Sequence, residues 1–95
     1  MSVARITTVT FNSEEAANDA SESYVTNAPG EFPAAQQLIG IKVDGNILIA
    51  VSLYEDNAAM ERADAARKKR MDSRKDNYVS VDTKVGTVEL NHSKA

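Results

Sequence analysis

Only a few side chains of this sequence are of types that do chemistry in proteins. Two of its three tyrosines, Tyr24 and Tyr54, offer an aromatic ring with a hydroxyl group, which suits a ligand pocket because it supplies both apolar area and a hydrogen bond. Filling the core is the commoner use of tyrosine, and both uses stay open here. The single histidine, His92, lies near the end of the chain with no metal ligand at suitable spacing, so we expect it to be solvated and to have no role in catalysis or metal binding.

A basic run at residues 67–75 is the most prominent charge feature. Such a run could bind an anion or nucleic acid. However, Asp64, Asp72 and Asp76 lie beside or within it. Asp64 also stands four residues before Lys68, which is the spacing of an ion pair on a helix. Few aromatic residues are near to stack on bases. We therefore expect a solvated helix face and no nucleic-acid partner, with nucleic-acid binding as the open alternative.

The composition narrows the class of protein. The chain has 95 residues, a formal net charge of -3 and no cysteine, which predicts one domain over residues 1–95 without disulfides or a general attraction to nucleic acid and anionic lipid. No apolar run approaches the roughly 20 residues that cross a bilayer, and no signal-peptide pattern is present. We therefore expect a cytoplasmic protein without a membrane partner. We expect no metal and no cofactor, because the sequence has no nucleophile–base pair, phosphate-binding loop or metal-ligand pattern.

The elements that would position these side chains are organised around residues 38–54, which predict two strands joined by a turn at residues 44–46. A two-residue loop would mix aliphatic and charged side chains on both faces of the hairpin. A three-residue loop, with its second or third residue in the left-handed conformation, sets Val43 opposite Ile47 and makes one face uniformly aliphatic. We therefore expect the second register.

Further strands and helices complete the pattern. We expect a strand over residues 3–11 and a helix from a cap at Ser13 to a stop at Pro29 and Gly30. A second helix should run from a cap at Asp56 or Asn57 to Met71, and a last strand over residues 78–90 should have a bulge or bend at Gly86. The order strand, helix, strand, strand, helix, strand predicts an α+β fold. Its architecture is a ferredoxin-like βαββαβ sandwich, a four-stranded antiparallel sheet with two helices on one face.

Two helices can cover only one face of such a sheet. The helix stripes are mostly alanine, so we expect the bulky Ile and Val face of the hairpin beneath them, because small side chains fill a layer best against large ones. The other face carries Leu48, Ala50 and Tyr54 and is too apolar to remain in water. We therefore predict a homodimer in which these three residues meet the partner sheet.

The same packing predicts space near Tyr24, where the first helix would lie over the sheet. Phe11 and Leu53 would form apolar walls of this ligand pocket, and Met60 would form an adaptable wall. Arg67 would reach the rim and orient an anionic or carbonyl-bearing ligand. The sequence assigns no catalytic residue.

Several stretches carry a resemblance to a known family. They are Gly40 and Ile41 at the opening of the second strand, the turn at residues 44–45, and the run IAVSLYED at residues 49–56, which leads into an Ala-rich helix with Arg67. In these features the chain resembles the dimeric α+β barrel superfamily, and within it the small antibiotic biosynthesis monooxygenase-like proteins. The resemblance implies a barrel formed by two sheets, with a ligand cavity between helices and sheet or near the dimer axis.

Members of that superfamily include cofactor-independent oxygenases acting on aromatic substrates, haem-degrading enzymes and proteins without an assigned activity. The haem-degrading pattern uses an Asn, a Trp and a helix-borne His, whereas this chain has no Trp and its His92 lies beyond the expected elements. The Trp of the oxygenase pattern is missing as well. The leading hypothesis is a homodimer with a pocket for a small organic ligand. Its candidate reaction is monooxygenase-like. The alternative is a non-catalytic small-molecule-binding or scaffolding module, so whether the protein is an enzyme stays open.

Overall fold

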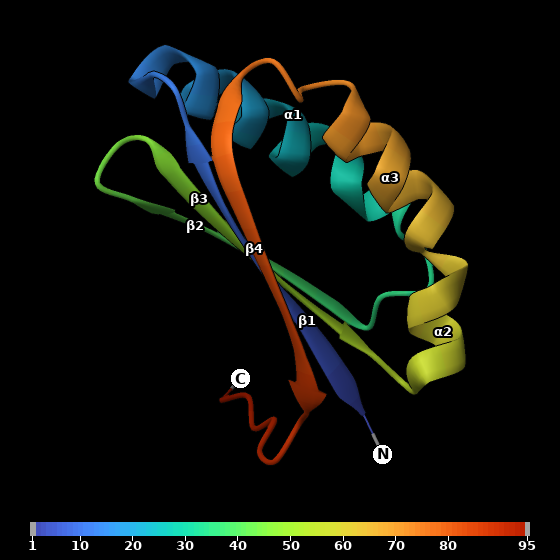
Figure 1. Cartoon of the computed structure of the whole chain (residues 1–95). Helices are drawn as coiled ribbons and strands as arrows, with labels where there is room; N and C mark the ends of the chain where they lie inside the picture. Colours follow the sequence, from blue (N-terminus) through green and yellow to red (C-terminus); the bar gives the residue numbers. More distant parts are fainter. Residues whose placement is uncertain (1, 95) are drawn as a thin grey trace.

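The fold consists of one antiparallel sheet with helices packed on one of its faces (Figure 1). The computed structural model describes residues 2–94. Within this range the elements are, in chain order, β1 (Val3–Phe11), α1 (Glu14–Glu31), β2 (Gln37–Val43), β3 (Ile47–Tyr54), α2 (Asn57–Arg62), α3 (Asp64–Asp72) and β4 (Tyr78–Thr87). The strand order in the sheet is β2-β3-β1-β4, and every neighbouring pair is antiparallel. The ferredoxin-like architecture predicted from the sequence is confirmed.

Local chemistry sets where the first helix begins. The Ser13 side chain accepts a hydrogen bond of 3.0 Å from the Ala16 amide and so caps α1, as predicted. The helix does not stop at Pro29 but continues to Glu31. The last turn persists because the Phe32 amide donates to the Ala28 carbonyl at 2.9 Å, and both of these residues are buried.

The second helical segment differs from the single helix that we expected. It starts as predicted, because the Asp56 carboxylate accepts a hydrogen bond of 2.8 Å from the Ala59 amide. The segment is then divided at Ala63, which ends α2 and begins α3. The Ala63 amide bonds the Met60 carbonyl at 3.0 Å in a tight turn at this break. The change of direction brings Asp64 to the side chain of Arg5, which donates to it at 2.6 Å.

The hairpin register is the one that the aliphatic pattern predicts. Val43 pairs with Ile47 across a three-residue loop, and the remaining pairs of β2 and β3 follow in step. Gly45, the second loop residue, has a φ of 80° as expected. Asp44 has a φ of 54° and joins it in the left-handed region, which Asp tolerates better than most residues.

The helices cover the opposite face of the sheet from the one that we expected. In β1 the side chains of Val9 and Phe11 are buried beneath the helices, and Leu48 pairs with Val9 and so points the same way. Leu48 packs in one cluster with Ala17 and Ala20 of α1. The physical reason lies in β1, which supplies the bulk that the alanine-rich helices require, whereas the prediction weighed the two faces of the hairpin alone.

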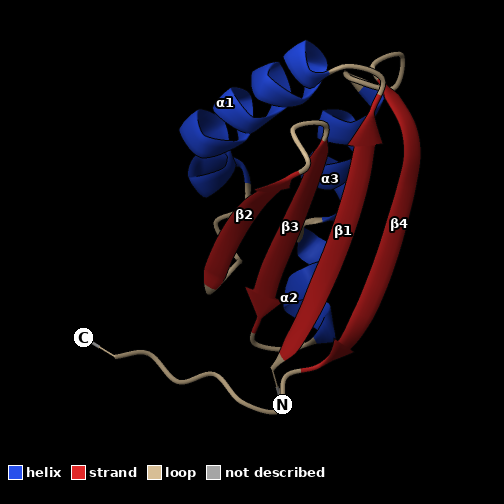
Figure 2. Ribbon diagram, turned by 90° about the vertical axis from the view of Figure 1, so that its left-hand side faces the viewer, coloured by secondary structure: helices blue, strands red, loops and turns tan. Residues whose placement is uncertain are grey.

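The predicted dimer-interface residues therefore fall on the wrong side. Leu48, Ala50 and Tyr54 lie on the helix-covered face, and Tyr54 is only 2% exposed. The open face instead carries the aliphatic side chains that we had placed under the helices, and Ile41 on it is 45% exposed. In Figure 2 this open face lies toward the viewer, and α2 and α3 lie behind the sheet.

The last strand is an edge strand and most of its residues are exposed. It ends at Thr87, earlier than predicted, and its pairing with β1 shifts register beside Thr10 and Phe11, not at Gly86. None of the helices in the described range is long and apolar enough to span a bilayer.

Candidate functional site

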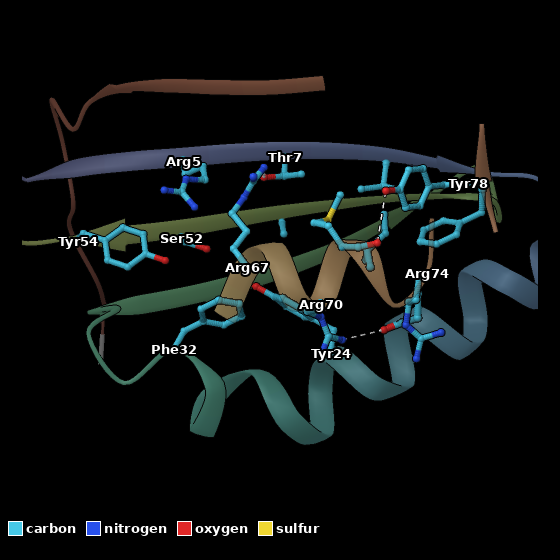
Figure 3. A pocket seen from close by; sticks show the side chains of 16 residues that line it. Arg5, Thr7, Tyr24, Phe32, Ser52, Tyr54, Arg67, Arg70, Arg74 and Tyr78 are labelled. Atoms are coloured by element: carbon cyan, nitrogen blue, oxygen red, sulfur yellow. Dashed lines mark hydrogen bonds between the residues drawn. The ribbon is translucent and has the colours of Figure 1, made fainter. Parts of the chain in front are cut away.

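A cavity of about 90 Å³ lies between the sheet and the helices α1 and α3, and it is partly open to solvent (Figure 3). Its floor is formed by alternate residues of β1 and β3, because side chains two positions apart on a strand share one face. Its aromatic walls are Phe11, Tyr24, Phe32, Tyr54 and Tyr78. Such a combination of apolar walls and a few polar groups is typical of small-molecule sites.

The structure brings together three of the five predicted pocket residues. Phe11, Tyr24 and Arg67 line the cavity, whereas Leu53 and Met60 do not. Leu53 pairs with Ala4, so it alternates away from the helix-covered side of the sheet. Met60 packs against the neighbouring core cluster from α2. The misplacement of Leu53 follows from the wrong choice of sheet face, whereas Met60 lies on α2, outside the helices that cover the cavity.

The basic run divides into two sides of α3 and the turn after it. Arg67, Arg70 and Arg74 line the cavity and are partly buried, whereas Lys68 and Lys69 are exposed. The three arginines are spaced by three and four residues, which places them on one side of a helix. Our expectation of a fully solvated face missed Arg70 and Arg74, although this spacing was visible in the sequence.

Two of the arginines that line the cavity, Arg5 and Arg70, are paired with carboxylates. Arg5, on β1, lines the cavity and is 8% exposed, and its guanidinium donates to the Asp64 carboxylate at 2.6 Å. Arg70 donates to the Glu31 carboxylate at 2.9 Å, and its guanidinium lies over the ring of Tyr24, 5.3 Å from the ring centre. These carboxylates neutralise two of the four arginines that line the cavity.

Arg67 is held differently. Its Nη2 donates to the hydroxyl groups of Thr7 at 3.3 Å and Thr83 at 2.8 Å, and Figure 3 shows its side chain extending from α3 toward Thr7. No carboxylate of the described residues is at salt-bridge distance from it. Burial lowers the pKa of the Arg67 guanidinium and nearby Arg5 lowers this pKa further, whereas Asp64 raises it.

The Tyr24 hydroxyl is buried and makes no hydrogen bond with a described residue. Burial raises the pKa of Tyr24, and the nearby hydroxyl of Ser52 lowers this pKa to a smaller extent. The two hydroxyl groups are thus neighbours, but no hydrogen bond of good geometry joins them. A buried polar group usually has a partner, because leaving it unpaired costs about 1–3 kcal/mol. Tyr24 therefore presents an unused, neutral donor inside the site.

The lining side chains can bind and stabilise negative charge. None of the residues that line the cavity in the described part of the chain is an Asp, Glu or His. Within residues 2–94 no three metal-ligating side chains are placed to hold an ion. The site can thus orient a ligand through Arg67 and Tyr24, but it offers no ordinary general base.

No protein-family model and no curated protein matches the chain. Its fold is nevertheless shared with several solved structures. The chain is similar to a proposed antibiotic biosynthesis monooxygenase from Nitrosomonas europaea, with a TM-score of 0.81 and 8% identity over 97% of this chain and 94% of that chain. It is also similar to a variant of SnoaB, a cofactor-independent oxygenase from Streptomyces nogalater, with a TM-score of 0.77 and 13% identity over 98% of each chain.

A dimeric ferredoxin-like protein from an uncultured marine organism gives a TM-score of 0.77 at 12% identity, over 99% of this chain and 93% of that chain. At such low identities the similarity shows the fold alone. At the level of the fold, the structural similarity confirms the resemblance inferred from the sequence. The chain has the ferredoxin-like fold of antibiotic biosynthesis monooxygenase-like proteins.

Proposed function

We propose that this chain is a homodimeric protein that binds a small organic ligand in the cavity between the sheet and the helices. One observation carries this proposal: the buried hydroxyl of Tyr24 has no hydrogen-bond partner among the described residues, inside a cavity whose other walls are largely apolar. Arg67 lines the same cavity, and no carboxylate of residues 2–94 lies at salt-bridge distance from its guanidinium. Unpaired donors of this kind are costly in an empty site and favourable when a ligand accepts from them.

The dimer part of the proposal rests on the open sheet face. Ile6, Ile39 and Ile41 are 40%, 37% and 45% exposed and lie on neighbouring positions of that face. A contiguous apolar patch on a sheet is typical of an association surface. A second copy of the chain covers it most simply, since a two-fold contact joins the same patch on both molecules. The dimeric ferredoxin-like protein of similar fold supports this arrangement.

The candidate reaction is cofactor-independent oxygenation of an aromatic or enolic substrate. The fold shared with SnoaB supports it. The arginines of the cavity would stabilise negative charge on such a substrate. Because the described lining has no carboxylate or imidazole base, the substrate would have to lose its proton readily once it is bound next to Arg67. The same lack of a base favours the second candidate, a non-catalytic binding module.

Two measurements test the proposal. Native mass spectrometry of the purified protein should show a dimer that retains an organic ligand, or that takes up a phenol or enol added from a panel. Oxygen consumption with the same panel separates the two candidates, because only the enzyme consumes oxygen. An enzyme should lose turnover in Arg67→Gln and keep it in Arg62→Gln, which removes an exposed arginine outside the cavity. If no compound binds and none is turned over, the proposal is wrong.

A further inference from the structure

The cavity carries more positive charge than the carboxylates around it neutralise. Arg5 and Arg70 are paired with Asp64 and Glu31 respectively. Both carboxylates come from outside the lining and are themselves partly solvated, with side chains that are 58% and 38% exposed. The first pair joins β1 to α3 and the second joins α3 to α1, so Arg5 and Arg70 have little capacity left for a ligand.

Arg67 has hydrogen-bond donors left for a ligand. Both of its hydrogen bonds leave from Nη2 and end on neutral hydroxyl groups, those of Thr7 and Thr83. Its Nη1 and Nε make no hydrogen bond to a described residue. A partly buried guanidinium without a counter-ion is unfavourable, and a planar anion is the partner that its fork of donors fits.

Tyr24 adds a second donor to the same cavity. Its oxygen is buried and has no partner among residues 2–94, and its hydroxyl is neutral at physiological pH, so it gains by donating to an acceptor on a ligand. Arg67 and Tyr24 come from different helices, α3 and α1. Both side chains line the same cavity, so a ligand that fills it would contact both.

The size of the cavity limits the rest of the ligand. A volume of about 90 Å³ is well below the ~300–1,000 Å³ of sites for drug-sized molecules. It is of the order of a cavity that holds a single benzene ring, about 150 Å³. The partial opening to solvent adds room for one end of the ligand. These dimensions favour a ligand with one ring over a fused system of several rings.

We propose that the cavity takes a small monocarboxylate, with one ring or a short chain as its apolar body. The carboxylate accepts from Nη1 and Nε of Arg67 and from the Tyr24 hydroxyl, and the apolar body lies against aromatic walls such as Phe11 and Tyr78. This inference rests on the proposed function, since it names the ligand class of the same site. It is independent of whether a reaction follows binding.

Benzoate and benzamide are suitable probes because they have nearly the same shape and differ in charge. Titration calorimetry or NMR at neutral pH should show benzoate binding about tenfold or more tightly than benzamide. Arg67→Gln should bring the affinity for benzoate down to that for benzamide, and Arg67→Lys should restore part of the difference. Arg62→Gln, the matched loss of an exposed charge, should keep the full preference.

The outcomes separate this inference from the proposed function. Equal affinities for benzoate and benzamide in the native protein would overturn the anion site and leave the ligand pocket standing. Binding of neither probe would overturn the monocarboxylate and count against the pocket itself. A preference for benzoate that survives in a folded Arg67→Gln variant would remove Arg67 from the site. Anthracene-2-carboxylate should bind more weakly than benzoate, and tighter binding would contradict the size limit.

Discussion

The ring of Tyr24 lies so close to Gly40 that a Cβ atom at position 40 would be 3.2 Å from Cε2 of the ring and 3.3 Å from its Cδ2. The guanidinium of Arg70 also lies over this ring, 5.3 Å from the ring centre. Gly40 thus supplies a position on β2 where the ring can approach the backbone. It helps to set how far Tyr24 projects into the cavity.

Gly40→Ala should therefore weaken ligand binding. The added methyl group must push the ring by a few tenths of an ångström, since contacts this short are unfavourable. We expect the overlap, which costs about 1–3 kcal/mol, to outweigh the gain of about 0.5–1 kcal/mol from removing a glycine from a strand. Urea unfolding should show a net loss of about 1 kcal/mol, and benzoate affinity should fall several-fold.

Gly86→Ala is the matched control for that variant. A Cβ atom at Gly86 meets no heavy atom within 4 Å, and this residue also lies in a strand, β4. It should leave the unfolding free energy unchanged or slightly raised and the affinity for benzoate unchanged. If both glycine variants behaved alike, the contact between Gly40 and Tyr24 would contribute neither to stability nor to benzoate binding.

Asp64→Asn should destabilise the protein, because it removes the only carboxylate that pairs with the buried Arg5 in the described structure. The Arg5 side chain is 9% exposed and would keep a charge with weaker compensation. Since Asp64 itself is largely solvated, we expect a loss of about 1–3 kcal/mol in urea unfolding, at the lower end of what breaking buried pairs costs.

Asp72→Asn provides the comparison, because Asp72 pairs with Lys68 on the surface of α3, where both side chains are exposed. It should not change the midpoint of urea unfolding measurably. An Asp64→Asn variant as stable as Asp72→Asn would mean that Arg5 is adequately solvated or paired in other ways.

The element order and the hairpin register could be predicted because they depend on local chemistry. Ser13 and Asp56 are good helix caps, and only a three-residue loop between Val43 and Ile47 makes one face of the hairpin aliphatic. The choice of sheet face depends on non-local packing. Both faces of β3 are apolar, and the decision comes from β1, whose inward side includes Phe11.

Site residues could be predicted from the sequence only where the spacing within one helix decides which way a side chain points. Tyr24 and Arg67 follow from helix spacing and lie in the cavity, whereas Leu53 was assigned through the wrong face. Arg5 could not be found from its neighbours in sequence, because a charged residue inside a strand normally points to solvent. Its burial becomes favourable only through Asp64, 59 residues away in the chain.

Tyr24 should give the protein a specific alkaline instability. Burial raises its pKa above the ordinary value of 10.0, more than Ser52 and Arg70 lower it. At a pH between the two pKa values the folded state keeps the phenol proton that the unfolded state has lost. The stabilisation is therefore fully present below pH 10.0 and is lost as the pH rises through the pKa of the folded state.

The difference in unfolding free energy between the native protein and Tyr24→Phe isolates this effect, because other titrating groups are common to both. Measured in urea from pH about 8 to about 11, this difference should shift against the native protein above the ordinary tyrosine pKa. A difference that stays constant with pH would show that Tyr24 titrates like a solvated tyrosine.

Ile41→Asp should convert the proposed homodimer into a monomer. Ile41 lies on the open aliphatic face and on the edge strand β2, so the substitution disturbs that face while the core beneath the helices stays intact. An unpaired carboxylate buried in a sheet-to-sheet interface costs several kcal/mol, which raises the dissociation constant by about two orders of magnitude or more. Light scattering at micromolar concentration should give twice the chain mass of 10.3 kDa for the native protein and the single mass for the variant. Val25→Asp is the control for this variant. Val25 is 74% exposed on α1, away from the sheet, so its replacement should leave the dimer unchanged. A native protein with the mass of one chain would refute the dimer. An Ile41→Asp variant that remains dimeric would place the interface on another surface.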